Sequence, residues 1–235
     1  FQNVSLVGGI PKHIFLEEED GFVPDVDEIK KHITKKTKLV ILNTPNNPTG
    51  AVVPKNVLEE IGDLAVEHDL ILLLDEVYER LVYEAKHVSL AAHSDLKDHI
   101  ITVFSLSKTY AMTGWRVGYA VSNANVIKAM STVSGYANAC QTSFAQKAAI
   151  TALDGPQDCV DAMVKEYRRR RDLMIKRLEE MNAFSVAKPT GAFYLYPRLL
   201  LNVESPDFVK QLIEKAKVAV MPGTAFSMKG EKYVR

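Results

Sequence analysis

Polar side chains that could take part in chemistry follow or precede four apolar segments of the sequence, at the points where strands would begin or end. The first segment ends in Asn43–Gly50 (NTPNNPTG), the second in Asp75–Tyr78 (DEVY) and the third in Ser105–Lys108 (SLSK), while Arg116 opens the fourth. Open parallel sheets bind their ligands beyond the carboxyl ends of the strands. We therefore expect these residues to converge on one ligand.

The types of these side chains fit an aldehyde that carries a basic ring nitrogen, a phenolic oxygen and a phosphate. Lys108 would bind the aldehyde covalently, and Asp75 would pair with the ring nitrogen and keep it protonated as an electron sink. Tyr78 and Asn47 would hydrogen-bond the phenolic oxygen. Three side chains have donors suited to the phosphate: Ser105, Ser107 and Arg116. Pyridoxal 5′-phosphate (PLP) carries all of these groups, so we expect it as the cofactor, and we expect no metal.

Taken singly, each of these residues also has a purely structural interpretation. Asp75 could cap a helix, because short polar side chains accept hydrogen bonds from helix N-termini. Tyr78 could be a core aromatic with a hydrated hydroxyl, and Lys108 could be a surface lysine. The remaining small polar residues of the set favour turns and caps: Asn47, Ser105 and Ser107. Only their joint order favours the functional interpretation.

Five longer strings resemble the class I/II aminotransferases of the fold-type I PLP superfamily, particularly the prokaryotic-type aspartate and aromatic branch. They are NTPNNPTG, LLLDEVYERLVY, SLSKTYAMTGWRVGYA, PTGAFYLYP and MPGTAFSMKGEKYVR. The resemblance runs from Phe1 to Arg235 in order, and the combination is highly specific although NPTG alone is weak. It places the same residues on the family's cofactor site: Asn47, Asp75, Tyr78, Ser105, Ser107, Lys108 and Arg116. Lys108, Asp75 and Tyr78 are thereby expected to be catalytic.

The resemblance also implies features that the residues alone do not indicate. Arg235 falls on the arginine that binds the substrate's α-carboxylate, with Asn47 beside it. Relatives carry further residues before Phe1, including a helix N-terminus that binds the phosphate, and they continue past Arg235. They are homodimers with active sites at the interface. We therefore expect an internal fragment of a homodimeric enzyme that moves an amino group between an L-amino acid and a 2-oxo acid.

The elements that must position these residues follow an alternating pattern, which is typical of βαβ units around a mostly parallel sheet. The expected strands cover residues 38–42, 70–74, 99–104 and 115–121. The first three are apolar on both faces, as strands with helices on both sides are. The fourth follows the third too closely for a helical crossover, so we expect it to be antiparallel. Pro54, as a first helical residue, predicts a crossover helix between the first two strands.

After Gly155-Pro156 a long helix is predicted over 157–181, with Arg171 in its apolar stripe. We expect its arginine cluster, residues 168–171, to form a solvated or interdomain face. Further strands are predicted over 184–186, 192–196 and 218–221, around a helix over 206–216. The fold class is thus α/β. A mostly parallel sheet forms a large PLP-binding domain over residues 1–165, and residues 166–235 form a smaller α/β domain.

Composition excludes several other classes of protein. The 29 Lys and Arg residues balance 29 Asp and Glu residues, which disfavours a nucleic-acid partner. The longest apolar run, residues 70–74, is far below the roughly 20 residues that span a bilayer, so we expect no membrane partner. Cys140 and Cys159 lack metal-ligand spacing, so we expect reduced thiols, in or near the core of a cytoplasmic protein.

Two alternative functions stay open from the sequence. One is a PLP-dependent lyase or synthase on the same fold, which would release ammonia or a thiol instead of a new amino acid. The other is the effector-sensing domain of a transcription regulator, which would need a basic helix-turn-helix segment upstream. The sequence does not name the amino donor either, since aspartate, aromatic, alanine and methionine donors all fit.

Overall fold

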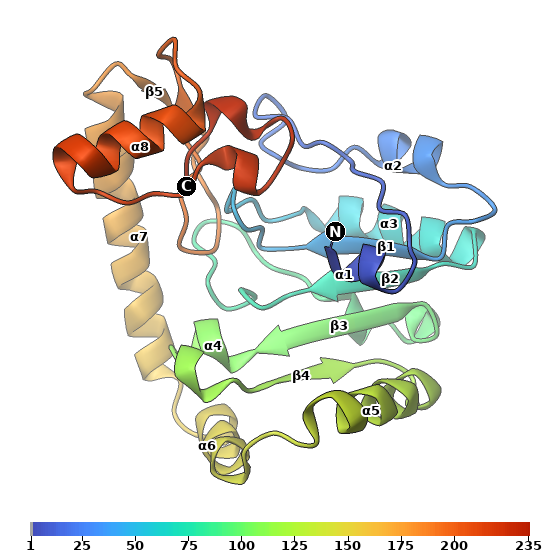
Figure 1. The fold of residues 1–235 in the computed structure, drawn as a ribbon. Coiled ribbons are helices and arrows are strands. Elements are labelled where there is room, and N and C mark those ends of the chain that lie inside the picture. Colours follow the sequence, from blue (N-terminus) through green and yellow to red (C-terminus); the bar gives the residue numbers. More distant parts are fainter. Residues whose placement is uncertain (1) are drawn as a thin grey trace.

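The computed structural model describes residues 2–235, and its main element is a four-stranded sheet in the order β1-β2-β3-β4 (Figure 1). The strands are β1 (Leu39–Asn43), β2 (Ile71–Asp75), β3 (Ile100–Ser105) and β4 (Gly118–Val121). The first three are parallel to one another, and β4 is antiparallel to β3. All four predicted strands are present, and the antiparallel direction of the fourth is confirmed. The fourth begins at Gly118 and not at Trp115, so the expectation that Arg116 opens it is wrong, because Arg116 has a left-handed backbone.

Helix α3 (Lys55–Glu67) is the predicted crossover between β1 and β2. Leu58 of this helix packs with Leu72 and Leu74 of β2 in the main hydrophobic cluster, where all three are almost fully buried. Pro54 is the N-cap of α3 and not its first helical residue, so that prediction is wrong by one position. Its backbone is extended (φ −61°, ψ 151°), and its carbonyl accepts the first helical hydrogen bond, from Leu58 N at 3.0 Å.

The two faces of the sheet are not equally covered. Leu39 and Ile41 of β1 have exposed fractions of 39% and 54%. The expectation that the first strand is buried on both faces is therefore wrong for residues 2–235. In this part of the chain β1 is an edge strand, and only the face that bears the buried Leu72 and Leu74 is packed against α3 and the main hydrophobic cluster.

Three helices follow β4: α5 (Ala124–Asn138), α6 (Ser143–Asp154) and α7 (Asp158–Glu179). The long helix α7 agrees with the prediction to within two residues at each end. It extends from α6, beside the sheet, to the C-terminal part of the chain (Figure 1). The predicted domain boundary near residue 165 falls inside this helix and stays a prediction.

The C-terminal part contains a two-stranded antiparallel sheet and a helix. These are β5 (Phe184–Ser185), β6 (Arg198–Leu199) and α8 (Ser205–Ala216), followed by the 3₁₀ turns η4 (Gly223–Ala225) and η5 (Gly230–Lys232). The strands predicted over 192–196 and 218–221 are wrong. Ala192 has a positive φ of 55°, which a regular strand does not allow. Residues 218–221 form no strand within residues 2–235, although Met221 exchanges two backbone hydrogen bonds with Arg235.

The remaining helical elements are short. They are α1 (Gln2–Leu6), α2 (Val26–His32), η1 (Leu90–Ala92), η2 (Ser94–Leu96), α4 (Leu106–Thr109) and η3 (Thr113–Trp115). None of the helices in residues 2–235 is long and apolar enough to cross a membrane. Cys140 and Cys159 are unpaired and exposed, because one lies in the loop between α5 and α6 and the other on an open side of α7. The expectation that they lie in or near the core is therefore wrong.

Candidate active site

The parallel register of β1 and β2 brings the first two polar segments together. Asn43 and Asp75, the last residues of these strands, are paired, and Asn43 Nδ2 donates to the backbone oxygen of Asp75 at 2.8 Å. Asn43 Oδ1 in turn accepts a hydrogen bond from Asn47 N at 2.7 Å. The loop after β1 is thus held on the end of β2, which places Asn47 at the carboxyl edge of the sheet.

The Asp75 carboxylate is partly buried and has few hydrogen-bond partners among the described residues. Its only hydrogen bond among the described residues is from Val77 N to Oδ1, at 3.4 Å, and no cationic side chain there forms an ion pair with it. Burial raises the pKa of this carboxyl group. The residues that follow form a turn, so Asp75 does not cap a helix. A charged carboxylate in this position favours a positively charged partner.

Tyr78 and Lys108 approach each other beyond the ends of β2 and β3. The Tyr78 ring is buried, its hydroxyl lies 2.9 Å from that of Tyr194, and burial is the main cause of its raised pKa. Lys108 belongs to the short helix α4, and its Nζ atom lies 5.9 Å from the ring centre of Tyr78 and 5.7 Å from that of Phe193. Two aromatic rings therefore flank the amine of Lys108.

The three candidate phosphate ligands lie at the same end of the sheet. Ser105 ends β3 and caps α4, since its hydroxyl accepts a hydrogen bond from Ser107 N at 3.2 Å. Gly118 pairs with Ser105 across β3 and β4, so Arg116, two residues earlier, extends beyond that edge. Arg116 is exposed, has a left-handed backbone (φ 53°), and donates from Nη1 to Thr113 O at 3.0 Å. Its other N–H groups form no hydrogen bond or ion pair with residues 2–235.

Arg235 is joined to this group from the far end of the chain. Its Nη1 donates to Asn47 Oδ1 at 2.9 Å. Its guanidinium carbon lies 4.6 Å from the ring centre of Tyr194 and 4.7 Å from that of Phe226. The structure therefore brings Arg235 to the site and does not place it on the open surface.

Two of the aromatic residues at this site were not singled out from the sequence. Phe193 and Tyr194 lie in the string PTGAFYLYP, but nothing in a single sequence says which aromatic of that string faces a lysine. The structure shows Tyr78 and Tyr194 in contact, with Lys108 and Arg235 on either side of the pair. The roles assigned to all these residues stay predictions.

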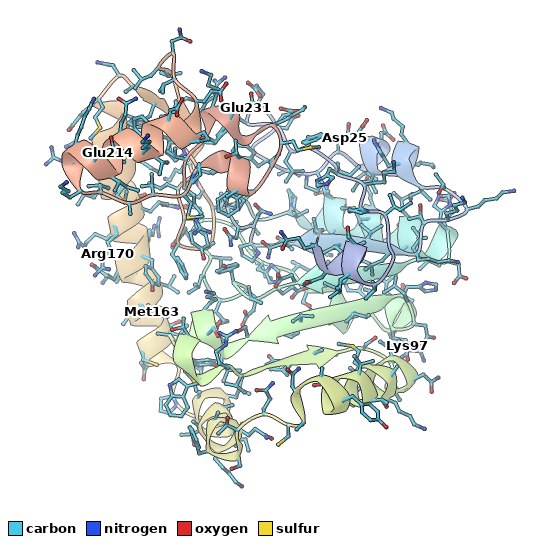
Figure 2. All side chains as sticks on the ribbon, viewed as in Figure 1. Asp25, Lys97, Met163, Arg170, Glu214 and Glu231 are labelled. Atoms are coloured by element: carbon cyan, nitrogen blue, oxygen red, sulfur yellow. The ribbon has the colours of Figure 1, made fainter. Side chains whose placement is uncertain are left out.

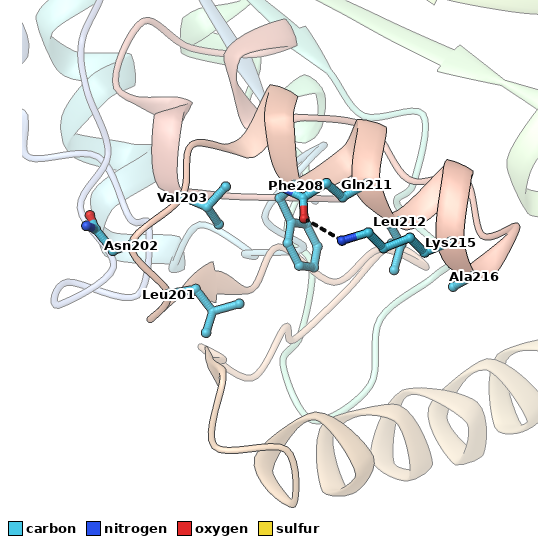
Figure 3. A pocket seen from close by; sticks show the side chains of 8 residues that line it. All are labelled: Leu201, Asn202, Val203, Phe208, Gln211, Leu212, Lys215 and Ala216. Atoms are coloured by element: carbon cyan, nitrogen blue, oxygen red, sulfur yellow. Dashed lines mark hydrogen bonds between the residues drawn. The ribbon is translucent and has the colours of Figure 1, made fainter.

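A separate cavity of about 370 Å³ lies in the C-terminal part of the chain (Figure 3). It is lined by Leu201, Asn202, Val203, Phe208, Gln211, Leu212, Lys215 and Ala216. Lys215 Nζ donates to Gln211 Oε1 at 3.3 Å on its rim. None of these residues belongs to the candidate site, so the cavity is not part of it.

Comparison with known proteins decides the family. A model of the family "aminotransferase class I and II" matches residues 2–235. The chain belongs to this family. It is 47% identical to an aspartate aminotransferase of Pyrococcus abyssi and 46% identical to aromatic-amino-acid aminotransferase 2 of Thermococcus litoralis. Each comparison covers 99% of this chain but 60% of the relative, so the chain spans about three fifths of their length.

Solved structures of class I and II aminotransferases have the same fold. An aromatic aminotransferase from Pyrococcus horikoshii gives a TM-score of 0.94 at 46% identity, covering 99% of this chain and 63% of that one. A mutant aspartate aminotransferase of Thermus thermophilus gives 0.90 at 40% identity, over 98% of this chain and 60% of that one. The predicted resemblance and the fold-type I α/β class are both confirmed.

Class I and II aminotransferases are PLP-dependent enzymes, and the residues of this chain fit that cofactor. The partly buried Asp75 carboxylate lacks a cationic partner among residues 2–235, which suits a protonated ring nitrogen. The amine of Lys108 lies near the Tyr78 ring, and the exposed Arg116 has N–H groups left for a phosphate. The predicted cofactor is therefore consistent with both the family and the local chemistry.

Proposed function

We propose that this chain carries the cofactor-binding lysine and the substrate-carboxylate arginine of an aminotransferase. The enzyme would move an amino group between an L-amino acid and a 2-oxo acid. The observation that carries this proposal is the continuous set of contacts from Lys108 through Tyr78 and Tyr194 to Arg235 and Asn47. In this set the Lys108 amine lies near the Tyr78 ring and the Arg235 guanidinium near the Tyr194 ring, which supports the two proposed roles.

When bound, PLP supplies an electron sink for the bond that breaks at the substrate's α-carbon. Lys108 Nζ would hold the cofactor, and its amine would move the substrate's α-proton as general base and general acid. The Asp75 carboxylate keeps a proton on the ring nitrogen by its charge, which is a preorganised electrostatic contribution. Its lack of a competing cation among the described residues leaves that charge available for the ring.

The other side chains bind and orient. Asn47 Oδ1 already accepts from Arg235, so its Nδ2 group is left to donate to the phenolic oxygen, beside the Tyr78 hydroxyl. Arg235 meets the substrate's carboxylate with a planar fork of donors, which gives orientation as well as affinity. The phosphate is bound by the remaining three residues: Ser105, Ser107 and Arg116.

The donor and the oligomeric state belong to the same proposal. Relatives named for aspartate and for aromatic amino acids favour a dicarboxylic or aromatic donor, and they do not favour the lyase or regulator alternatives. A homodimer is supported by exposed apolar side chains on α5 and α6, which a second copy would cover. They are Met130, Val133, Tyr136, Phe144, Ile150 and Leu153. A cytoplasmic location is supported by the two unpaired cysteines.

The test uses protein expressed from the complete reading frame. We expect near-visible absorption, and we expect borohydride to fix the cofactor on Lys108, as peptide mapping would show. Lys108→Ala should abolish the covalent label, whereas the surface control Lys97→Ala should keep it. Label on any other lysine contradicts the proposal, and a donor screen on the same protein identifies the substrate class.

A further inference from the structure

Arg171 is a buried arginine on a helix whose other arginines face solvent. It lies on α7 and is only 5% exposed, while the side chains of Arg169 and Arg170 are each 64% exposed. Figure 2 shows Arg170 pointing away from the body of the molecule. Arg171 occupies a position in the apolar stripe of α7 where a leucine would pack without the desolvation of a charge. Its presence there calls for a specific reason.

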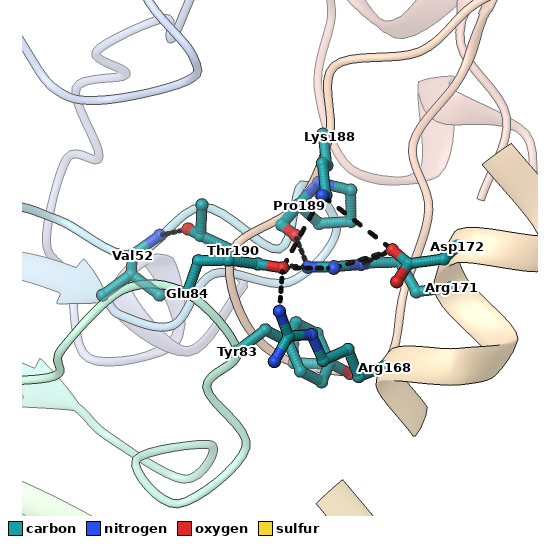
Figure 4. Close-up of polar contacts among 10 residues, drawn as sticks. Val52, Tyr83, Glu84, Arg168, Arg171, Asp172, Lys188, Pro189 and Thr190 are labelled. Carbon is teal, nitrogen blue, oxygen red and sulfur yellow. Dashed lines mark hydrogen bonds and ion pairs between the residues drawn. The ribbon is translucent and has the colours of Figure 1, made fainter. Parts of the chain in front are cut away.

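All five N–H groups of the Arg171 guanidinium are used (Figure 4). Nη1 and Nη2 donate to the two carboxylate oxygens of Glu84, each at 2.7 Å. Nε and Nη2 donate to Asp172 Oδ1 at 2.9 and 2.7 Å, and Nη1 also donates to Pro189 O at 2.8 Å. Arginine is the only side chain with five donors in one plane, so a lysine cannot reproduce these contacts.

The guanidinium also stacks on Tyr83, which reaches the same segment as Pro189. The guanidinium carbon of Arg171 lies 4.5 Å from the Tyr83 ring centre, and the Tyr83 hydroxyl donates to Ala192 O. Tyr83 N donates to Thr190 O at 3.0 Å. Arg171 therefore holds residues 189–192 directly through Pro189 and indirectly through Tyr83.

The opposite side of this segment rests on the loop after β1. Thr190 N and Gly191 N donate to Gly50 O at 3.1 and 2.8 Å, and Val52 N donates to Thr190 Oγ1 at 3.1 Å. A Cβ atom at Gly50 would lie 2.4 Å from Pro189 Cβ, so the two segments are in close contact. Residues 189–192 are thus fixed between the β1 loop on one side and Arg171 on the other.

The end of this fixed segment is the part that enters the candidate site. Phe193 flanks Lys108 Nζ at 5.7 Å, and the Tyr194 hydroxyl meets that of Tyr78 at 2.9 Å. Arg235 stacks on the Tyr194 ring. A shift of residues 189–192 would move both aromatic rings relative to Lys108.

We propose that Arg171 is a positioning residue for the amino-transfer site. Arg171, held by its ion pair with Glu84, fixes the position of residues 189–192. This position in turn determines where the Phe193 and Tyr194 rings lie relative to Lys108 and Tyr78. The inference rests on the proposed function, because it assigns Tyr78 a hydrogen bond to the cofactor that Tyr194 helps to orient. Arg171 itself touches neither substrate nor cofactor.

The test compares Arg171→Lys with Arg169→Lys, a matched change at an exposed position of the same helix, in full-length holoenzyme. The first readout is the pH midpoint of the near-visible absorption, which senses the hydrogen bond from Tyr78. A change in one such bond corresponds to a shift of about 0.5–1 pH unit, and we expect that shift for Arg171→Lys and none for Arg169→Lys. We also expect kcat to fall about tenfold, since the rings no longer hold the reacting amine in place.

The third readout, after the pH midpoint and kcat, is amide hydrogen exchange of residues 190–194 in the cofactor-free protein, which we expect Arg171→Lys to accelerate locally. Tyr83→Phe, which removes only the hydroxyl bond to Ala192 O, should move all three readouts in the same direction by less. If Arg171→Lys does not fold, the same three readouts on Tyr83→Phe test the inference, and no change in any of them overturns it. If Arg171→Lys lowers the thermal stability but leaves the pH midpoint, kcat and local exchange unchanged, the inference is overturned. If the unmutated protein shows no near-visible absorption, the proposed function fails, and exchange at residues 190–194 still decides whether Arg171 clamps them.

Discussion

Replacing Asp75 with asparagine should have opposite effects on two properties: the cofactor-free protein should be no less stable, and the enzyme should be much less active. At neutral pH the ionised carboxylate is partly desolvated, and its pKa is raised by burial. A raised carboxyl pKa means that the native state binds the proton more tightly than the unfolded chain. The stability this group contributes is therefore present at low pH and is lost as the pH rises through the native pKa. Asp75→Asn carries no charge, so we expect the free energy of unfolding at pH 7 to be equal or higher.

In the enzyme with PLP bound, we expect Asp75→Asn to reduce the transamination rate strongly. Among the described residues the Asp75 carboxylate accepts one hydrogen bond, from Val77 N at 3.4 Å, which an amide oxygen can also accept, so the substitution removes only the charge. Removing one partner of a buried ion pair costs about 3–5 kcal/mol. If that interaction is fully expressed in the transition state, transamination slows by about two to four orders of magnitude.

The assay measures urea unfolding of the cofactor-free protein and the transamination rate at saturating PLP. Asp63→Asn, at an exposed position of α3, is the matched control and should change neither quantity. Activity of Asp75→Asn within tenfold of the unmutated protein would refute the electrostatic role. A clear drop in the stability of the cofactor-free variant would show instead that Asp75 is a structural turn residue.

Three further predictions test other parts of the molecule. Arg235→Lys should raise KM for every amino donor by about 10- to 100-fold without weakening PLP binding, because the forked contact is lost; equal KM values would remove Arg235 from the site. Hydrogen bonds from Arg171 lower the pKa of Glu84 to about 2, so its contribution to stability is present above about pH 4.5 and is lost as the pH falls toward 2. Between pH 7 and pH 3, the free energy of unfolding measured in urea should fall less for Glu84→Gln than for the unmutated protein. An equal fall in both proteins would contradict the pairing of Glu84 with Arg171. Gly50→Ala should lower the free energy of unfolding by about 2 kcal/mol or more, because the residue has φ 72° and no room for a Cβ atom. Gly21→Ala, with φ 65° and open space, should cost about 1 kcal/mol, and equal effects would show that crowding at Gly50 is unimportant.

The direction of the strands was predictable because it depends on local pattern. Short apolar runs separated by a helical stretch give parallel neighbours, and the brief link before residues 118–121 leaves only an antiparallel return. The positions of Asp75 and Lys108 follow from the same logic, since Asp75 ends β2 and Lys108 lies in the turn of helix directly after β3. The functions of these residues were inferred from their joint order and stay predictions.

What the sequence could not indicate depends on contacts between distant residues. The partner of Arg171 is Glu84, 87 positions away, so an arginine in an apolar stripe looked like an irregularity of the helix. Residues 192–196 have the apolar composition of a strand, but Ala192 takes a positive φ, its N–H bonds to Leu81 O, and its carbonyl to the Tyr83 hydroxyl. Tertiary contacts overrode local propensity there.

The hydrogen bond between Asn47 and Arg235 joins residues 188 positions apart, and this distance orders events during synthesis of the chain. A nascent chain leaves the ribosome from its N-terminal side and folds in that direction. The strands β2 and β3, which end at Asp75 and just before Lys108, can therefore pair while Tyr194 and Arg235 have not yet been made. Under the proposed role of Arg235, its contacts with Asn47 and with the substrate's carboxylate can form only after residue 235 emerges, when the strands of the cofactor-binding part can already have paired.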